Sequence, residues 1–209
     1  MSTPGEFAVR AVLLVTAFLQ AVGPVEARPV KSLLEMRREN VVVQEWDISC
    51  GAAALSSLLT FHLGDPVTER EVAKSLIRRA EYVADPMLVR ARQGYSLLDL
   101  KRDVDGRGYV GIGYGGMSVE DLVERAPVIV PIDADGYRHF VIFRGVLGKR
   151  VLLADPAWGN RTMPIEKFES MWLEYPEIGK VGFVVVKQNH TNAPVNRLMP
   201  RPEEFLILR

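Results

Sequence analysis

The stretch "QEWDISCGAAALSSLL", Gln44 to Leu59, contains the single cysteine of the chain. Polar residues precede Cys50 and small or aliphatic residues follow it, which predicts a helix from Cys50 to about His62. A helix N-terminus favours negative charge and so promotes the nucleophilic thiolate, and we expect Gly51 to leave room beside the sulfur for a substrate carbonyl. The alternative is a buried core residue, because unpaired cysteine is among the most buried residue types.

The composition is that of a soluble globular protein. The chain has 209 residues, of which 48% are hydrophobic and 25% are charged, enough for one domain with a substantial core. Lys and Arg together number 26, as do Asp and Glu, so the charge balance favours neither nucleic acid nor an anionic membrane as a partner.

The N-terminus has the pattern of a secretory signal peptide. Arg10 precedes the apolar run Ala11–Val22, and a helix-breaking Gly-Pro pair and small residues up to Ala27 follow. The alternative is an uncleaved anchor, but the apolar run is shorter than the roughly 20 residues that span a membrane. In an exported protein a lone cysteine cannot form an intrachain disulfide, which marks Cys50 as a candidate reactive thiol.

The predicted helices come first along the chain and the predicted strands come second. Three capping boxes mark helix starts: Thr68 with Glu71, Ser96 with Asp99, and Ser118 with Asp121. Short β-branched or aromatic runs separated by turns predict four strands: Pro127–Ile132, His139–Val146, Arg150–Asp155 and Val181–Val186. Helices followed by an antiparallel sheet predict an α+β fold.

These patterns divide the chain into three parts. Residues 1–27 are the predicted signal peptide, residues 28–190 form one domain, and residues 191–209 form a C-terminal tail. Within the domain, Val41–Gln44 is expected to be a short strand, and the glycine-rich Tyr109–Gly116 a strand and a loop.

Of the three histidines, His139 is the candidate base for the thiol. His62 lies on the same predicted helix as Cys50, about 18 Å further along its axis, too far for proton transfer. The turn near Gly148 folds the hairpin so that Asp155 lies beside His139, and facing side chains in such a ladder are close. Asp155 can then hold one imidazole nitrogen and leave the other for the thiol. Separately, the two residues would be an ordinary strand-end histidine and a turn aspartate.

Two further residues are candidates near this site. The amide of Gln44, six positions before Cys50, is a candidate donor to an oxyanion, together with the Cys50 backbone N–H. Trp158 is a candidate wall of a substrate pocket or a shield over the site, with simple packing as the alternative. The sequence lacks zinc-binding and dinucleotide-binding motifs, so we predict no metal and no cofactor.

Together, "QEWDISCGAAAL", Gln44 to Leu55, and "HFVIFRGVLGKRVLLADPAWGNRTM", His139 to Met163, resemble the bacteriocin-processing cysteine peptidase family. The similarity extends over residues 38–187 and includes "GYSLLDLKR", Gly94 to Arg102. The resemblance implies a papain-like fold that packs N-terminal helices on a C-terminal antiparallel sheet, and a peptidase that cuts leader peptides after a double glycine. It also implies roles in the site for Gln44, Cys50, His139 and Asp155.

Two departures from that family are visible in the sequence. Ser49 stands where many members have Asp, and better-known members are fused to exporter segments that this chain lacks. The chain is more similar to stand-alone periplasmic members, including one that accompanies functional-amyloid secretion systems. The prediction is a periplasmic cysteine peptidase that processes a secreted polypeptide. Two alternatives stay open: a thiol acyltransferase or amidase that uses the same site, and a non-catalytic module that binds and escorts a secreted chain.

Overall fold

The computed structural model describes residues 31–188, 194–201 and 205. The predicted signal peptide lies outside these residues, as do parts of the predicted tail. The helices of the described part are α2 Leu33–Arg38, α3 Cys50–Ser57, η1 Leu58–Leu63, α4 Glu69–Ile77, α5 Ala80–Ala84, α6 Met87–Ala91, α7 Leu97–Gly106, α8 Val119–Arg125 and α9 Ile165–Met171.

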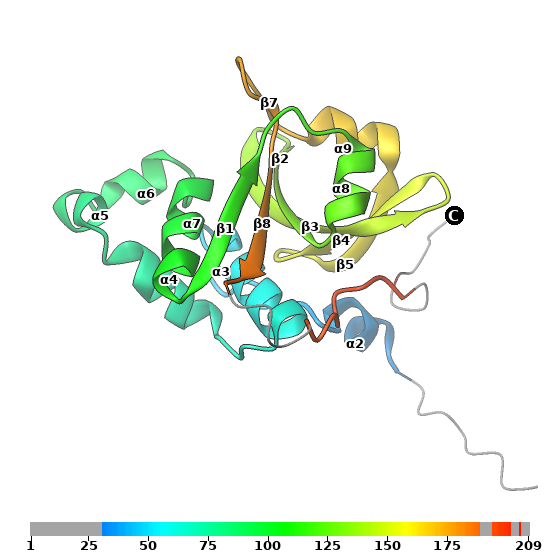
Figure 1. The fold of residues 1–209 in the computed structure, drawn as a ribbon, viewed down its shortest axis with the longest axis horizontal. Helices are drawn as coiled ribbons and strands as arrows, with labels where there is room; N and C mark the ends of the chain where they lie inside the picture. The colour runs from blue at the N-terminus through cyan, green and yellow to red at the C-terminus, as the bar shows by residue number, and fades with distance from the viewer. Residues whose placement is uncertain (1–30, 189–193, 202–204, 206–209) are drawn as a thin grey trace, which may run out of the picture. The chain divides into compact units, whose positions relative to one another are not determined.

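The strands form a six-stranded antiparallel sheet and a small two-stranded one. The strands are β1 Tyr109–Tyr114, β2 Val128–Ala134, β3 Tyr137–Leu147, β4 Arg150–Asp155, β5 Gly159–Pro164, β6 Glu174–Tyr175, β7 Gly179–Lys180 and β8 Gly182–Lys187. The large sheet has the order β1-β8-β2-β3-β4-β5, and β6 pairs with β7. The predicted α+β class is therefore confirmed (Figure 1).

Alternate residues of the strands enter two separate hydrophobic cores. Ile142 and Ala154 belong to the core that also contains side chains of α3, α4 and α7. Their sequence neighbours Val141 and Leu153 belong to the second core, with side chains of α8 and α9. The sheet therefore buries both faces, as strands with near-continuous apolar runs do.

Helix starts were the best-predicted local feature. The predicted capping boxes of α4, α7 and α8 are all present, each with both reciprocal hydrogen bonds. The same signal, Ser32 with Glu35, begins α2, a helix that was not predicted from the sequence. A capping box satisfies two orphan N–H groups with side chains that are three residues apart, so it depends on local sequence alone.

One local expectation was wrong. Val41–Gln44 forms no strand: the Val42 N–H donates to Ser57 Oγ at 2.8 Å and the Gln44 N–H to the Pro156 carbonyl at 2.8 Å. The predicted helix from Cys50 to about His62 is present, but it changes to a π-helix at Leu58, ends at Leu63 and is capped by Gly64, whose φ is +75°. Such a left-handed C-cap suits glycine, which has no Cβ to clash.

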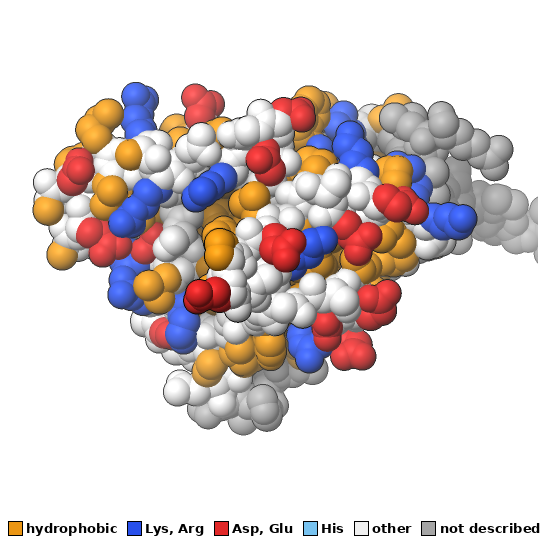
Figure 2. Space-filling model, turned by 90° about the horizontal axis from the view of Figure 1, so that it is seen from above, with side chains coloured by type: hydrophobic (Ala, Val, Ile, Leu, Met, Phe, Trp, Pro, Cys, Tyr) orange, Lys and Arg blue, Asp and Glu red, His pale blue; other side chains and the backbone are white. Residues whose placement is uncertain are grey.

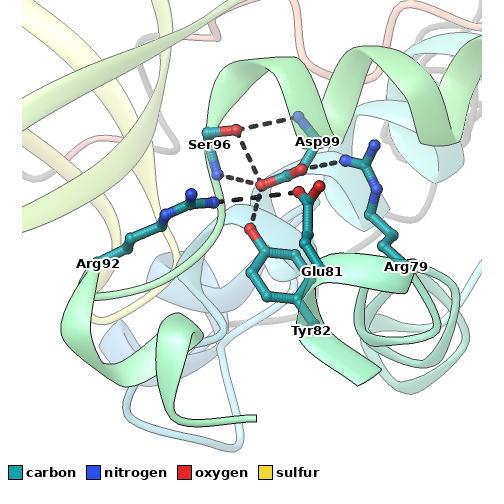
Figure 3. A network of polar contacts seen from close by, with 6 residues as sticks. All are labelled: Arg79, Glu81, Tyr82, Arg92, Ser96 and Asp99. Atoms are coloured by element: carbon teal, nitrogen blue, oxygen red, sulfur yellow. Dashed lines mark hydrogen bonds and ion pairs between the residues drawn. The ribbon is translucent and has the colours of Figure 1, made fainter. Parts of the chain in front are cut away.

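The buried carboxylate of Asp99 attaches α5 to the first turn of α7. Asp99 accepts hydrogen bonds from the backbone and hydroxyl of Ser96, each at 2.8 Å, and from the hydroxyl of Tyr82 on α5. Arg79 pairs with the same carboxylate, and Figure 3 shows these groups converging on it. The cap of α7 therefore also fixes the position of α5.

The described surface carries mixed charge. Figure 2 shows one face on which Lys or Arg side chains are interspersed with Asp or Glu, in keeping with equal numbers of basic and acidic residues. Among the described residues, no helix combines the length and the apolar character that crossing a membrane requires.

Candidate active site

Cys50 is the first residue of α3, and it is also buried. Every residue of this helix is buried, and Cys50 has only 2% of its surface exposed. Two sequence interpretations therefore describe the same residue: it starts a helix and it lies inside the fold. Its sulfur is consequently held among fixed neighbours, near the unpaired N–H groups of the first helical turn.

His139 and Asp155 are brought together by β3 and β4. His139 Nε2 lies 2.7 Å from Asp155 Oδ1, and both side chains are buried, with exposed fractions of 5% and 0%. The predicted hairpin turn is present, since Leu147 faces Arg150 across it. The two residues do not face each other directly, however. Ala154 faces Ile142, so the pair meets diagonally across the ladder, which is within reach of long side chains.

Asp155 has other partners that hold its carboxylate. Oδ1 also accepts a hydrogen bond from the Ala157 N–H at 2.8 Å. Oδ2 lies 2.9 Å from Nε of Arg161, a strand residue of β5. This N–H is not directed at the oxygen, so the contact is an ion pair rather than a hydrogen bond. Asp155 therefore has a fixed orientation from which it can hold the imidazole.

The neighbours of His139 favour its charged form. Burial alone lowers the pKa of an imidazole, but hydrogen bonds to Asp155 and Cys50 and the negative charges of both raise the pKa of His139 to about 9. Because Nε2 is bound to Asp155, Nδ1 is the ring nitrogen left for the thiol. The site can therefore hold an imidazolium beside the sulfur of Cys50 at neutral pH.

Gln44 begins a tight turn that leads into Cys50. The Trp46 carbonyl accepts three hydrogen bonds there: from Gln44 Nε2 at 2.8 Å, from Ser49 Oγ at 2.7 Å and from Ser49 N at 3.2 Å. The buried carboxylate of Glu69 accepts from the Glu45 N–H at 3.0 Å. Burial raises the pKa of Glu69, although hydrogen bonds from the Ser49 side chain and the Glu45 N–H act in the opposite direction. The backbone before the thiol is thus fixed from two sides.

The structure gives the two predicted substrate-contacting residues different surroundings. A Cβ on Gly51 would lie 3.2 Å from the Phe140 ring, so this glycine makes room for packing of that side chain. Trp158 is 60% exposed and lines a cavity of about 350 Å³ together with His139 and Asp155. His139 also lines a second cavity, of about 450 Å³, whose wall includes Phe140 and residues 92–98. A contact of Gly51 or Trp158 with substrate stays a prediction.

Two residues near the site were missed by the sequence analysis. Tyr137 donates a hydrogen bond to the Asp47 carbonyl, and burial and the negative charges of Cys50 and Asp47 raise the pKa of its hydroxyl. Arg161 was missed because "GNRTM" is polar and was not recognised as a strand. The burial of this strand does not alternate along its length, so no periodic pattern marked it in the sequence. Among the described residues, no group of three or more His, Cys, Asp or Glu side chains is placed to hold a metal ion.

Comparison with known proteins places this geometry in a family. Residues 38–176, most of the chain, match the model of the family described as the Peptidase C39 family. The chain belongs to the peptidase C39 family. This C39 chain is a cysteine-type peptidase, and the predicted family resemblance is confirmed.

Two curated relatives are identical to this C39 peptidase at about a third of the aligned positions. The "Probable functional amyloid protease FapD" of Pseudomonas aeruginosa is 33% identical over 176 residues, covering 84% of this chain and 72% of the relative. The protein of the same name from Pseudomonas fluorescens is 35% identical over 150 residues, covering 72% of this chain and 64% of the relative.

Two solved C39 domains have the same fold. A double glycine motif protease from an AMS/PCAT transporter, solved with its leader peptide, has a TM-score of 0.53 at 21% identity over 71% of this chain and 91% of that one. The peptidase domain of Streptococcus ComA has a TM-score of 0.56 at 16% identity, over 72% of this chain and 100% of that one. The predicted papain-like peptidase fold is therefore confirmed.

Proposed function

We propose that this C39 peptidase is exported and cleaves a polypeptide in the periplasm by thiol chemistry. Cys50 is the nucleophile, His139 the acid and base, Asp155 the residue that orients the imidazole, and Gln44 a donor to the oxyanion. The observation that carries the proposal is the 2.7 Å contact between His139 Nε2 and the buried Asp155 carboxylate, beside a cysteine that starts a helix.

The proposed reaction proceeds through a thioester. The Cys50 thiolate attacks the peptide carbonyl carbon, and a C–S bond forms. When the C–N bond breaks, His139 gives its proton to the leaving amine. A water molecule then attacks the thioester, His139 takes one of its protons, and the product acid leaves while the thiolate is regenerated. Asp155 stabilises the imidazolium throughout and remains ionised.

The oxyanion of each tetrahedral intermediate needs preorganised donors. The Cys50 backbone N–H belongs to the first turn of α3 and has no partner within the helix. One hydrogen of the Gln44 amide is bound to the Trp46 carbonyl, which fixes the plane of the amide and leaves the second hydrogen for the oxyanion. We propose these two groups as the oxyanion hole.

The proposed substrate is a polypeptide of a secretion system. Support comes from the relatives named as functional amyloid proteases and from the fold shared with a leader-peptide protease. An amyloid subunit or a component of its export is the specific substrate we propose. The proposal that the protein is exported rests on the sequence of residues 1–27, where we expect cleavage after Ala27. Mass spectrometry of the N-terminal peptide of the mature protein tests this cleavage.

The test compares exported proteins from three strains that carry wild type, Cys50→Ala or His62→Gln. Peptide N-termini that depend on the enzyme are expected to disappear in Cys50→Ala, because alanine cannot form the thioester. They should persist in His62→Gln, because His62 lies on η1, outside the site, where its carbonyl accepts a hydrogen bond from the Asn196 N–H. Both strains are checked for equal amounts of the folded protein.

Three outcomes would contradict the proposal. Unchanged N-termini in Cys50→Ala would exclude thiol peptidase activity. Normal export of the client in that strain would favour the binding module instead. If the purified protein with an added amine forms amide products in place of free carboxylates, the enzyme is an acyltransferase.

A further inference from the structure

Strand β3 contains one residue more than its partner. Phe143 faces Leu153 and Gly145 faces Leu152, so the register shifts by one residue and Arg144 is the extra residue of β3. This is a β-bulge, which re-aims the side chains that follow it. Pairing of β3 with β2 is regular from Tyr137 to Phe143, so the irregularity belongs to the β3–β4 hairpin alone.

The bulge decides which face of the sheet Asp155 occupies. Continuing the pairing beyond Ile142 and Ala154 places Asp155 opposite Val141, on the same face as His139. Without the extra residue, the register set at the hairpin turn would place Asp155 opposite Ile142. A shift of one residue moves every side chain to the other face, so Asp155 would then point away from the imidazole.

The side chain of Arg144 is buried and fixed by chain segments that are far away in sequence. Its exposed fraction is 1%. Nε donates to the Leu198 carbonyl at 2.7 Å and Nη2 to the Met199 carbonyl at 3.2 Å, while Nη1 donates to Asn160 Oδ1 at 2.7 Å. The Phe205 ring lies 4.9 Å from the guanidinium carbon. The bulge is therefore attached to the C-terminal segment, residues 196–200.

The partners of Arg144 are themselves anchored in the domain. Asn160 Nδ2 donates to the Met36 and Glu39 carbonyls at the end of α2, at 3.2 and 2.8 Å. Leu198 is fully buried in the core that contains α3. The Arg197 N–H donates to the Phe61 carbonyl of η1 at 2.8 Å. The C-terminal segment thus connects the bulge to the helix that begins at Cys50.

We propose that Arg144 is a positioning residue for the active site, which fixes the β3 bulge through the C-terminal segment and so holds Asp155 against His139. The proposal rests on the proposed function of His139 and Asp155. The alternative is that the hydrophobic alternation of β3 and β4 sets the bulge by itself, and that the guanidinium only fills space.

The test uses Arg144→Met, which keeps a long side chain and removes every donor. The readouts are the titration of the His139 imidazole by NMR and the alkylation rate of Cys50 by iodoacetamide across pH. Cys50 is the single cysteine, so alkylation reports on it alone. In the variant the titration midpoint should fall by about one unit or more from its value near 9, because the imidazolium loses its carboxylate. The change in the alkylation rate that accompanies the ionisation of His139 should move to lower pH by the same amount.

A purely structural role would not move these readouts. Leu122→Ala is the matched control, since Leu122 is fully buried on α8 in the second core. It should lower stability and leave the His139 titration unchanged. Asn160→Ala removes one partner of Arg144 and should give a smaller shift in the same direction, which keeps the proposal testable if Arg144→Met does not fold.

Other charged or titratable groups that share the two cavities with His139 are the same in every variant: Asp135, Tyr137, Arg161, Lys167, Arg92, Tyr95, Arg138 and Tyr175. A folded Arg144→Met or Asn160→Ala protein with the wild-type titration would overturn the proposal. Neither readout requires turnover, so failure here is distinct from failure of the proposed peptidase activity, which Cys50→Ala tests.

Discussion

At the scale of single residues, the charge of His139 governs the site. A buried imidazole without partners would be neutral at pH 7, but Asp155 and Cys50 reverse this preference. Because the pair of thiolate and imidazolium is the reactive form of such a site, activity and stability should depend on the same titration.

The stability of the fold should therefore contain a contribution from His139 that falls at alkaline pH. The pKa of this side chain rises from 6.5 to about 9 on folding. A raised pKa stabilises the fold fully below 6.5, and the contribution is lost as the pH rises through 9. We expect wild type to lose on the order of 3 kcal/mol relative to His139→Gln between pH 6 and 10, measured by urea unfolding. Parallel curves for the two proteins would refute this.

Gln44 should affect turnover and leave substrate binding unchanged. Removing one donor of an oxyanion hole typically lowers kcat by about 10²- to 10³-fold. We expect that loss in Gln44→Ala with an unchanged KM, measured on a peptide spanning a cleavage site from the strain comparison. Glu45→Ala is the control, because the Glu45 side chain is exposed and its backbone N–H still reaches Glu69. A rise in KM alone would assign Gln44 to substrate binding.

At the scale of elements, capping boxes of the same sequence type differ in importance. The box of α8, Ser118 with Asp121, is exposed and serves only its own helix. The box of α7 uses Asp99, which is 1% exposed and also binds Tyr82 and Arg79 (Figure 3). Tertiary contacts therefore add stability to a helix N-terminus that the local sequence already encodes.

Mutations in the capping boxes of α8 and α7 should lower the stability of the protein by different amounts. Ser118→Ala should lower the free energy of unfolding by about 1 kcal/mol, as loss of a cap does. Asp99→Ala should lower it by about 3 kcal/mol or more, because Arg79 and Tyr82 lose a buried partner. Chemical unfolding of both variants checks this, and equal losses would show that the buried network adds nothing beyond the cap.

At the scale of the whole molecule, the C-terminal segment completes the domain. Leu198 is fully buried in the core that contains side chains of α3 and α4. Its carbonyl accepts a hydrogen bond from Arg144 in the β3 bulge, and the neighbouring Arg197 N–H donates to η1. Residues that the sequence places in a tail thus contribute to the packing of the helix that carries Cys50.

This contribution should be measurable as stability. Leu198→Ala should lower the free energy of unfolding by about 3 kcal/mol, the usual cost of a cavity at a buried leucine. Met199→Ala is the matched control, because its side chain is half exposed and a surface change costs about 0.5 kcal/mol or less. Similar small losses in both variants would mean that the segment is only loosely attached.

The sequence by itself determined the local features of this protein. Capping boxes, the turn at Gly148 and the apolar runs of β2, β3, β4 and β8 depend on residues close together in the chain. They predicted the α+β fold, and the spacing of Cys50, His139 and Asp155 selected them as candidates. Polar β5 and short α5 and α6 were missed because their own residues carry little periodicity.

Only the tertiary structure decided how the candidates meet. The sequence predicted that Asp155 would face His139, but the Arg144 bulge places the two residues diagonally on one face of the sheet. A bulge arises when two strands and their surroundings are fitted together, here with the C-terminal segment and Asn160. Such contacts join residues far apart in the chain, and no pattern within a single stretch of sequence records them.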